Sequence, residues 1–181
     1  MISRRALVMA GGAWAVAQAA SAHTLYPQWL AYRRKHLLIG SHRKDNATYL
    51  LAEELVAHIN HVLPKANARA ARAPHPERLA SLIGTDQMEV AVLGRAEAAK
   101  MKAGVGRFAP YGEIALSRLA DFGPYTLVAE ASFPTRHAWM ISAAIDDSAL
   151  SQSIEGSAVL PLHAGVEAYR TGIALKELDD A

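Results

Sequence analysis

The sequence predicts an α/β fold, a single three-layer lobe built on a mostly parallel sheet. Two observations lead to this prediction. The first is a set of short apolar runs, each of which ends at a glycine or a polar turn. The second is that segments whose apolar residues recur at helical spacing alternate with these runs. This alternation gives the order β-α-β-α-β-α between residues 36 and 102. Strands joined in this way are expected to be parallel, with right-handed crossovers and any ligand at their carboxyl ends.

The first expected strand is the apolar run at residues 37–40, which ends at a glycine turn. A helix follows, for which Asp45 is the expected N-cap because its side chain can accept a hydrogen bond from a free helical N–H group. Pro64 is expected to end this helix. Its apolar face is Leu51, Leu55, Ile59 and Val62.

The remaining elements follow from local composition, because β-branched runs favour strands and runs rich in alanine and charged residues favour helices. Glycines and a proline make residues 104–112 the expected linker. His163 opens the last helical stretch, where a capping or packing role is expected. The expected strands are residues 66–73, 89–93 and 124–130, the expected helices are 74–83, 95–102 and 135–145, and 146–157 is an expected polar loop.

The N-terminus has the layout of a signal peptide. Arg4 and Arg5 precede an apolar stretch at residues 6–20, and small residues follow at 20–22. The apolar stretch is shorter than the roughly 20 residues that span a bilayer. The choice between Sec and Tat export stays open. The domain plan is a signal peptide or uncleaved membrane anchor at 1–22, a juxtamembrane or linker segment at 23–35, the α/β lobe at 36–175 and a tail at 176–181.

The expected location is therefore the periplasm, with anchoring to the inner membrane as the alternative if the N-terminal segment is retained. Membrane contact is then expected only through residues 1–35.

Composition excludes several classes of protein. The 19 basic and 17 acidic residues of the 181-residue chain leave a net charge of +2. This does not indicate the strongly basic surface that binds a polyanion, so nucleic acid is not an expected partner. The chain has no cysteine, which excludes disulfides, c-type haem, iron–sulfur clusters and thiolate zinc sites. No cofactor is expected.

Four segments, taken in order, resemble a known family. They are Leu38-Ile39-Gly40-Ser41 running into Thr48-Tyr49; residues 77–92 by spacing; Phe122-Gly123-Pro124-Tyr125 through Val128 with Pro134, Ala138 and Ala143-Ala144; and Pro161-Leu162-His163-Ala164-Gly165 with Tyr169 and Gly172. The chain resembles the TAXI family of solute receptors that serve TRAP transporters. The resemblance implies a periplasmic-binding-protein-like fold, which in the family has two lobes and a ligand in the cleft.

The sequence departs from this family in two ways. The segments that resemble the first lobe are followed almost directly by those at which the family's chain returns to that lobe. The second lobe is therefore expected to be missing. The opening loop, commonly glycine-rich in the family, is residues 42–46, His-Arg-Lys-Asp-Asn. A single lobe offers a shallow, wet surface, which disfavours ordinary solute capture.

Two hypotheses for function remain open. One is a non-catalytic accessory or structural subunit that docks on a protein partner in a larger periplasmic or membrane complex. The alternative is a reduced receptor for a small anionic ligand, a carboxylate, that feeds a TRAP-type transporter. A subunit should show a large apolar docking patch, for example where the absent lobe once packed, whereas a receptor should keep a concave polar pocket at residues 40–49.

The candidate ligand site is the turn from strand to helix at residues 41–49, because backbone N–H groups and the positive end of a helix attract anions. Exposure to water alone is the competing interpretation for its charged side chains. The candidate ligand-binding residues are Ser41, His42, Arg43, Asn46, Thr48, Tyr49, Gly94 and Arg95.

Metal and catalytic sites are not expected. His58 has Glu54 and His61 at helical ligand spacing, but a hydrogen-bonded core histidine is the commoner role for such a residue. The sequence shows no nucleophile paired with a base and no phosphate loop. Ser41 and His42 are adjacent in the sequence, but this alone does not bring the His42 imidazole within hydrogen-bonding distance of the Ser41 hydroxyl. Asp146-Asp147 is a polar pair in an expected loop. We therefore predict that the protein is not an enzyme.

Overall fold

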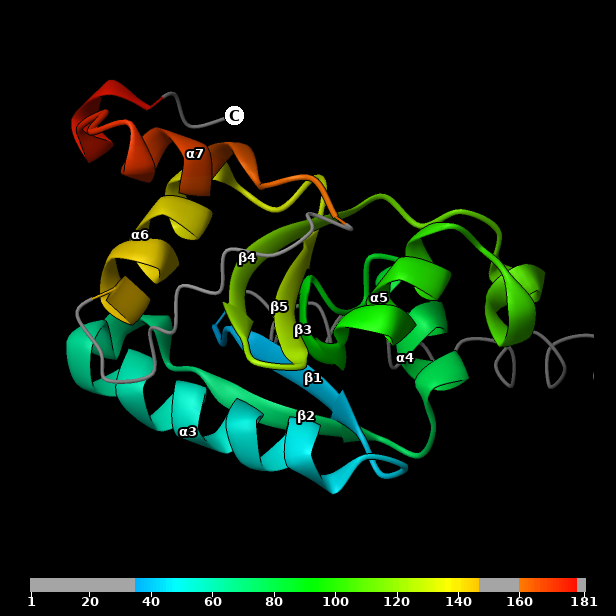
Figure 1. Ribbon diagram of the computed structural model, residues 1–181. Helices are drawn as coiled ribbons and strands as arrows, with labels where there is room; N and C mark the ends of the chain where they lie inside the picture. Colours follow the sequence, from blue (N-terminus) through cyan, green and yellow to red (C-terminus); the bar gives the residue numbers. More distant parts are fainter. Residues whose placement is uncertain (1–34, 147–159, 179–181) are drawn as a thin grey trace, which may run out of the picture. The chain divides into compact units, whose positions relative to one another are not determined.

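The computed structural model describes residues 35–146 and 160–178. From His36 onward they belong to one compact unit, in which five strands form a sheet of order β2-β1-β3-β5-β4 with helices on both faces (Figure 1). The predicted α/β class is confirmed. None of the helices in these residues has the length and apolar character needed to cross a membrane. The expected signal or anchor segment at 1–22 lies outside the described residues, as does nearly all of the loop expected at 146–157.

The first half of the unit follows the predicted alternation. Local signals set its boundaries: the carboxylate of Asp45 accepts a hydrogen bond from the Ala47 N–H at the start of the first helix, as predicted. A short 3-10 helix at Pro64–Ala66 includes residue 66, which was expected to be the first residue of the strand at 66–73. The elements are β1 (Leu38–His42), α3 (Asn46–Val62), β2 (Arg69–Ala73), α4 (Pro76–Ile83), β3 (Val90–Gly94) and α5 (Arg95–Lys102).

The sheet is mixed, so the prediction of a mostly parallel sheet is corrected. Strands β1, β2 and β3 are parallel, but β5 (Tyr125–Glu130) pairs antiparallel with both β3 and β4 (Leu116–Phe122). Strand β4 was not predicted from the sequence. It forms a hairpin with β5 through a two-residue turn in which Gly123 has a φ of 59°. A hairpin needs no crossover helix, and its two strands are necessarily antiparallel.

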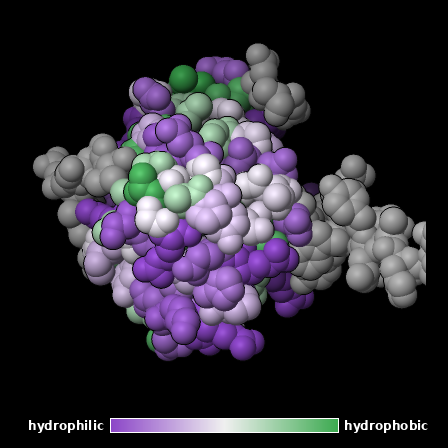
Figure 2. Space-filling view, turned by 90° about the vertical axis from the view of Figure 1, so that its right-hand side faces the viewer, coloured by the Kyte–Doolittle hydropathy of each residue, from purple (hydrophilic) through white to green (hydrophobic). Residues whose placement is uncertain are grey.

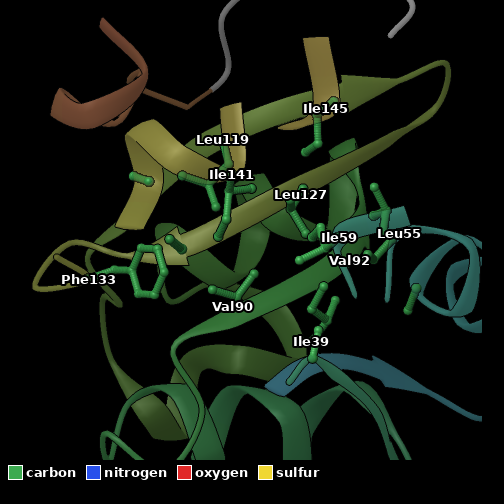
Figure 3. Packing of buried hydrophobic residues seen from close by; sticks show 14 of the residues in the cluster. Ile39, Leu55, Ile59, Val90, Val92, Leu119, Leu127, Phe133, Ile141 and Ile145 are labelled. Carbon is green, nitrogen blue, oxygen red and sulfur yellow. The ribbon is translucent and has the colours of Figure 1, made fainter. Parts of the chain in front are cut away.

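The core lies on both faces of the sheet. Successive residues of a strand point to opposite faces, so β3 is apolar along its length and buried on each side. On one face the side chains of β1, β3, β4 and β5 meet those of α3 and α6 (Thr135–Asp146) (Figure 3). On the other face the side chains of β2, β3, β4 and β5 meet α4, α5 and the 3-10 helix η2 (Gly106–Tyr111). The first cluster includes Ile39, Leu55, Ile59, Val92, Leu127 and Ile141, and the second includes Leu79, Ile83, Leu93, Met101 and Phe108.

The C-terminal elements pack on α6. Helix α7 (Ala164–Arg170) begins after His163, whose Nδ1 accepts a hydrogen bond from the Gly165 N–H, which confirms the predicted capping role. The Trp139 ring meets Tyr169 edge-on at 5.2 Å, and its Nε1–H donates to the Ile173 carbonyl at 2.8 Å. A short 3-10 helix, η3 (Leu175–Glu177), follows.

His163 makes the stability of the fold depend on pH. Burial of its imidazole, opposed by a smaller contribution from the Phe133 backbone, lowers the pKa of His163 below its ordinary value of 6.5. The unfolded chain therefore binds more protons than the native one as pH falls below about 6.5. We expect the free energy of unfolding to decrease between pH 7.5 and pH 5.5 and to decrease less in His163→Asn, which keeps a good N-cap.

Urea unfolding of both proteins at the two pH values measures this difference. Equal losses of stability in the wild type and in His163→Asn would show that His163 does not contribute to the pH dependence.

Candidate functional site

The carboxyl ends of β1 and β3 form the point at which the connections of the sheet change face. After β1 the chain enters α3 on one face, whereas after β3 it enters α5 on the other. The loops that leave two neighbouring strands in opposite directions create the position where ligands bind in open α/β sheets. Residues 42–45 and Gly94 lie at this position.

Several predicted site residues on the α3 side are engaged within the protein. The buried Ser41 hydroxyl donates to the Ala71 carbonyl at 3.2 Å, and the buried Thr48 hydroxyl donates to the Asp45 carbonyl at 2.7 Å. The Asp45 carboxylate occupies the N-terminal end of α3, where an added anion would be repelled by it. The expected anion position at the start of α3 is thus already filled by a side chain of the chain itself.

Asn46 and Tyr49 lie on the outer side of α3 and both meet Arg72 of the edge strand β2. The Arg72 Nη2 donates to the Asn46 Oδ1 at 2.7 Å, and its guanidinium lies 4.5 Å from the centre of the Tyr49 ring. A hydrogen bond with Glu53 raises the pKa of the Tyr49 phenol. Arg43 is exposed in the loop before α3.

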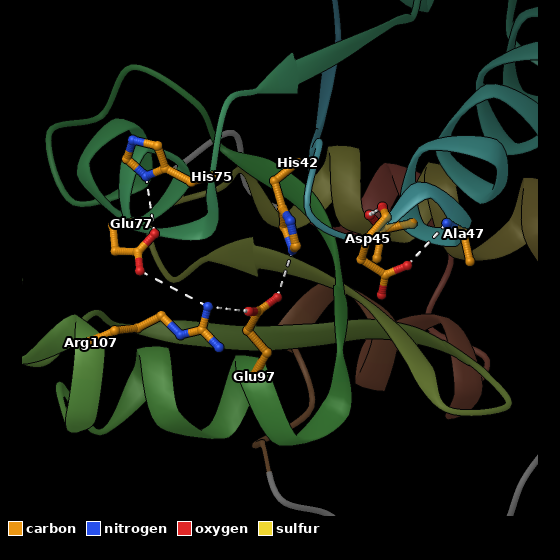
Figure 4. A network of polar contacts seen from close by, with 8 residues as sticks. His42, Asp45, Ala47, His75, Glu77, Glu97 and Arg107 are labelled. Carbon is orange, nitrogen blue, oxygen red and sulfur yellow. Dashed lines mark hydrogen bonds and ion pairs between the residues drawn. The ribbon is translucent and has the colours of Figure 1, made fainter.

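His42 turns to the opposite side, toward α5. Its buried imidazole lies with Nε2 2.7 Å from Glu97 Oε2, and in the tautomer that carries a proton on Nε2 this nitrogen donates to the carboxylate (Figure 4). The other ring nitrogen, Nδ1, is buried without a hydrogen-bond partner. A histidine held by a carboxylate can serve as a base, but the Ser41 hydroxyl is directed at Ala71 instead.

The contacts of His42 continue through residues that the sequence analysis missed. The Arg107 Nη1 lies 3.9 Å from Glu97 Oε1 and 4.0 Å from Glu77 Oε1, and Glu77 in turn meets His75 at 3.0 Å (Figure 4). The backbone N–H at the start of α4, together with His75 and Arg107, lowers the pKa of Glu77. Glu77 and Glu97 each lie in the first turn of a helix that follows a strand, a position that could have identified them.

Gly94 and Arg95 lie apart from the α3 side of the site. Gly94 is the N-cap of α5, and the backbone N–H of Arg95 donates to the Pro124 carbonyl at 2.9 Å. The Arg95 Nε lies 3.6 Å from Asp121 Oδ1, and Arg118 Nη1 donates to the other oxygen of the same carboxylate. The eight predicted residues therefore do not converge on one point.

The histidine with possible metal-ligand spacing joins two helices. The His58 Nε2 hydrogen-bonds to the Ala144 carbonyl at 2.7 Å and so links α3 to α6, which is the structural role expected for it. Throughout residues 35–146 and 160–178, no group of three or more histidine or acidic side chains is placed to hold a metal ion.

Comparison with known proteins adds no family to this description. No family model matches the chain, and no curated protein matches its sequence. The resemblance to TAXI receptors therefore stays a prediction that rests on the four quoted segments.

Proposed function

We propose that this protein is a non-catalytic exported subunit, related to TAXI solute receptors, that docks on a partner in a larger periplasmic or membrane-bound complex. The observation that carries this proposal is the loop at residues 104–112, called the 104–112 loop below. It is closed at its base, anchored in the core and apolar at its surface.

The 104–112 loop is closed at its base and anchored in the core. Gly104 and Gly112 have φ values of 60° and 67°, and a Cβ on Gly104 would lie 2.4 Å from the Gly112 carbonyl group, so the two ends of the loop touch. Between them, the Phe108 ring is fully buried beside α4 and α5. Compact loops with adjoining ends and an internal anchor are frequently functional, and their preformed shape reduces the entropy lost on binding.

The exposed part of the 104–112 loop suits a protein partner. Val105 is 48% exposed and Tyr111 is 39% exposed, and Ala109 and Pro110 between them are also exposed. Figure 2, which views the unit from the side on which α4 and α5 lie in Figure 1, shows a mostly hydrophilic surface with apolar residues in small groups. This face does not show the large apolar patch expected of a subunit, so docking through this loop is a compact contact, with tyrosine as its natural anchor.

The charges beside the loop define the chemistry of the partner. Lys100 is exposed next to the apolar residues, Glu113 is exposed just after the loop, and Arg107 is exposed but also meets Glu77 and Glu97. We infer that the partner offers a small apolar pocket with an acidic group opposite Lys100. The internal engagement of Ser41, Asp45 and Thr48 supports the same proposal, because these groups are not directed at a solute.

The test uses the full chain, tagged and purified from its source membrane and periplasm. Val105→Asp/Tyr111→Asp places two charges on the loop surface, and Leu50→Asp is the matched control, because Leu50 is 52% exposed on α3. We expect the wild type and the control to co-purify with one partner at a fixed ratio, and the double variant to elute alone while still unfolding in one cooperative thermal transition. A wild type that elutes alone, or a double variant that keeps the partner, would contradict the proposal.

A further inference from the structure

We propose that the outer edge of β2 binds an extended acidic segment of a partner protein, which joins the sheet as a further strand. This surface is different from the 104–112 loop, and the proposal does not rest on the docking function. Residues 69–72 of β2 are called the β2 edge below.

The two edges of the sheet are not alike. Strand β4 is covered by the chain itself, because the Arg118 N–H donates to the Pro161 carbonyl at 2.8 Å and the Arg118 carbonyl accepts from the His163 N–H at 3.0 Å. Strand β2 lies at the opposite edge, and among the described strands it pairs with β1 alone (Figure 1). Of the two edges, β2 is therefore the one that a further strand can join.

Alternate residues of β2 turn their backbone groups away from β1. The Arg69 N–H donates to the Leu37 carbonyl at 2.9 Å, so Arg69 and every second residue after it face β1. The N–H and carbonyl groups of Ala70 and Arg72 consequently point outward. No hydrogen bond from the part of the chain that the structure describes reaches these backbone groups, which are thus open to an incoming strand.

The residue just before β2 is already bonded in the way that a neighbouring strand would bond it. The Asn60 side chain on α3 donates from Nδ2 to the Ala68 carbonyl at 3.0 Å, and its Oδ1 accepts from the Ala68 N–H at 2.6 Å. At the other end of the strand, Pro74 has no N–H to offer. The open stretch is therefore short and suits a segment of about four residues.

The side chains leave the β2 edge accessible. Ala70 and Ala71 carry only a methyl group. A charged side chain that extends past a strand edge prevents pairing, but the Arg72 guanidinium is held against α3, over the Tyr49 ring and bonded to Asn46.

Two positive charges on the β2 edge define the chemistry of the partner. Arg69 and Arg72 are exposed, and neither forms an ion pair with a described residue. They are three residues apart, so their side chains lie on opposite faces of the sheet. A partner strand meets both with acidic residues that are also three apart, and β-branched residues between them fill the space beside the alanines.

The test adds the peptide acetyl-Thr-Glu-Val-Val-Glu-Thr-amide to the full chain and follows the backbone amides by NMR. Antiparallel pairing, the more stable arrangement, sets the two glutamates opposite Arg72 and Arg69. We expect the Ala70 and Arg72 amide resonances to shift saturably and their hydrogen exchange to slow. The control peptide acetyl-Thr-Val-Glu-Val-Glu-Thr-amide has the same composition but both glutamates on one face, so it should bind about fivefold more weakly.

Two methylated peptides test whether backbone hydrogen bonds form. The N–H of the second valine is directed at the Ala70 carbonyl, whereas the N–H of the first valine points away from β2. Methylation of the second valine nitrogen should therefore abolish binding, and methylation of the first should leave it intact.

Two variants of the protein test the charges. Arg69→Glu sets like charges opposite each other and should weaken binding of the first peptide at least about fivefold. Lys176→Glu makes the same change of charge on η3, which packs on α6, and should bind as the wild type does. Backbone amide spectra of each variant confirm that it is folded.

Four results would overturn the proposal. The first is the absence of a saturable shift at Ala70 and Arg72. The second is equal affinity for the first peptide and its control, which would indicate attraction by charge alone. The third is binding of the peptide methylated at the second valine. The fourth is a shift of the two resonances with protein concentration in the absence of peptide, which would place a second copy of the chain on this edge.

Discussion

Replacing Phe108 with alanine is expected to lower the free energy of unfolding by about 3–5 kcal/mol. The Phe108 ring is fully buried between α4, α5 and the sheet, and the ends of its loop are held together at Gly104 and Gly112. Because these contacts hold the backbone in place, the surroundings can collapse only in part and a cavity is left. A loss of this size is a large share of the roughly 5–15 kcal/mol that stabilises a typical domain.

Urea unfolding measures the effect, and Tyr111→Ala is the matched control. It removes an aromatic side chain from the same loop, but from a position that is 39% exposed, so its loss of stability should be clearly smaller than that of Phe108→Ala. Under the docking proposal, this control nevertheless weakens partner binding. Similar stabilities for Phe108→Ala and Tyr111→Ala would contradict the anchoring role of Phe108.

Replacing Gly165 with alanine is expected to lower the free energy of unfolding by about 1–3 kcal/mol. In an ordinary helix this substitution is stabilising by roughly 0.5–1 kcal/mol, because alanine loses less conformational freedom on folding. The sign is reversed in α7 because the added Cβ would lie 2.1 Å from the Thr135 carbonyl oxygen and 2.9 Å from the Trp139 backbone nitrogen. Both atoms belong to the backbone of α6, so relief requires the two helices to separate.

The control for Gly165→Ala is Gly94→Ala. Gly94 has a φ of −62°, and a Cβ at this position would meet no atom within 4 Å. We expect this variant to differ from the wild type by less than about 1 kcal/mol, the range set by exchange of glycine for alanine at a helix N-cap. If Gly165→Ala proves as stable as Gly94→Ala, the close packing of α7 on α6 is wrong.

The candidate site was predictable only in part. The turn after β1 and the start of α5 were identified because each strand ends in a recognisable turn. The side chains that His42 and Arg95 contact could not be identified in the same way. Glu97 is 55 residues from His42, and Asp121 belongs to a strand that was not predicted from the sequence. Without that strand, no pattern in the sequence could bring Arg95 and Arg118 to one carboxylate.

The sequence by itself determined the α/β class, the order of the first six elements and the caps at Asp45 and His163. These features depend on residues that are close in the chain, where apolar spacing and capping side chains act directly on the backbone. Only the tertiary structure decided the mixed sheet, the direction in which His42 turns and the meeting of Arg95 with Arg118. Each of these depends on which strands pair and on the face that each residue then occupies, and pairing joins segments that share no local signal.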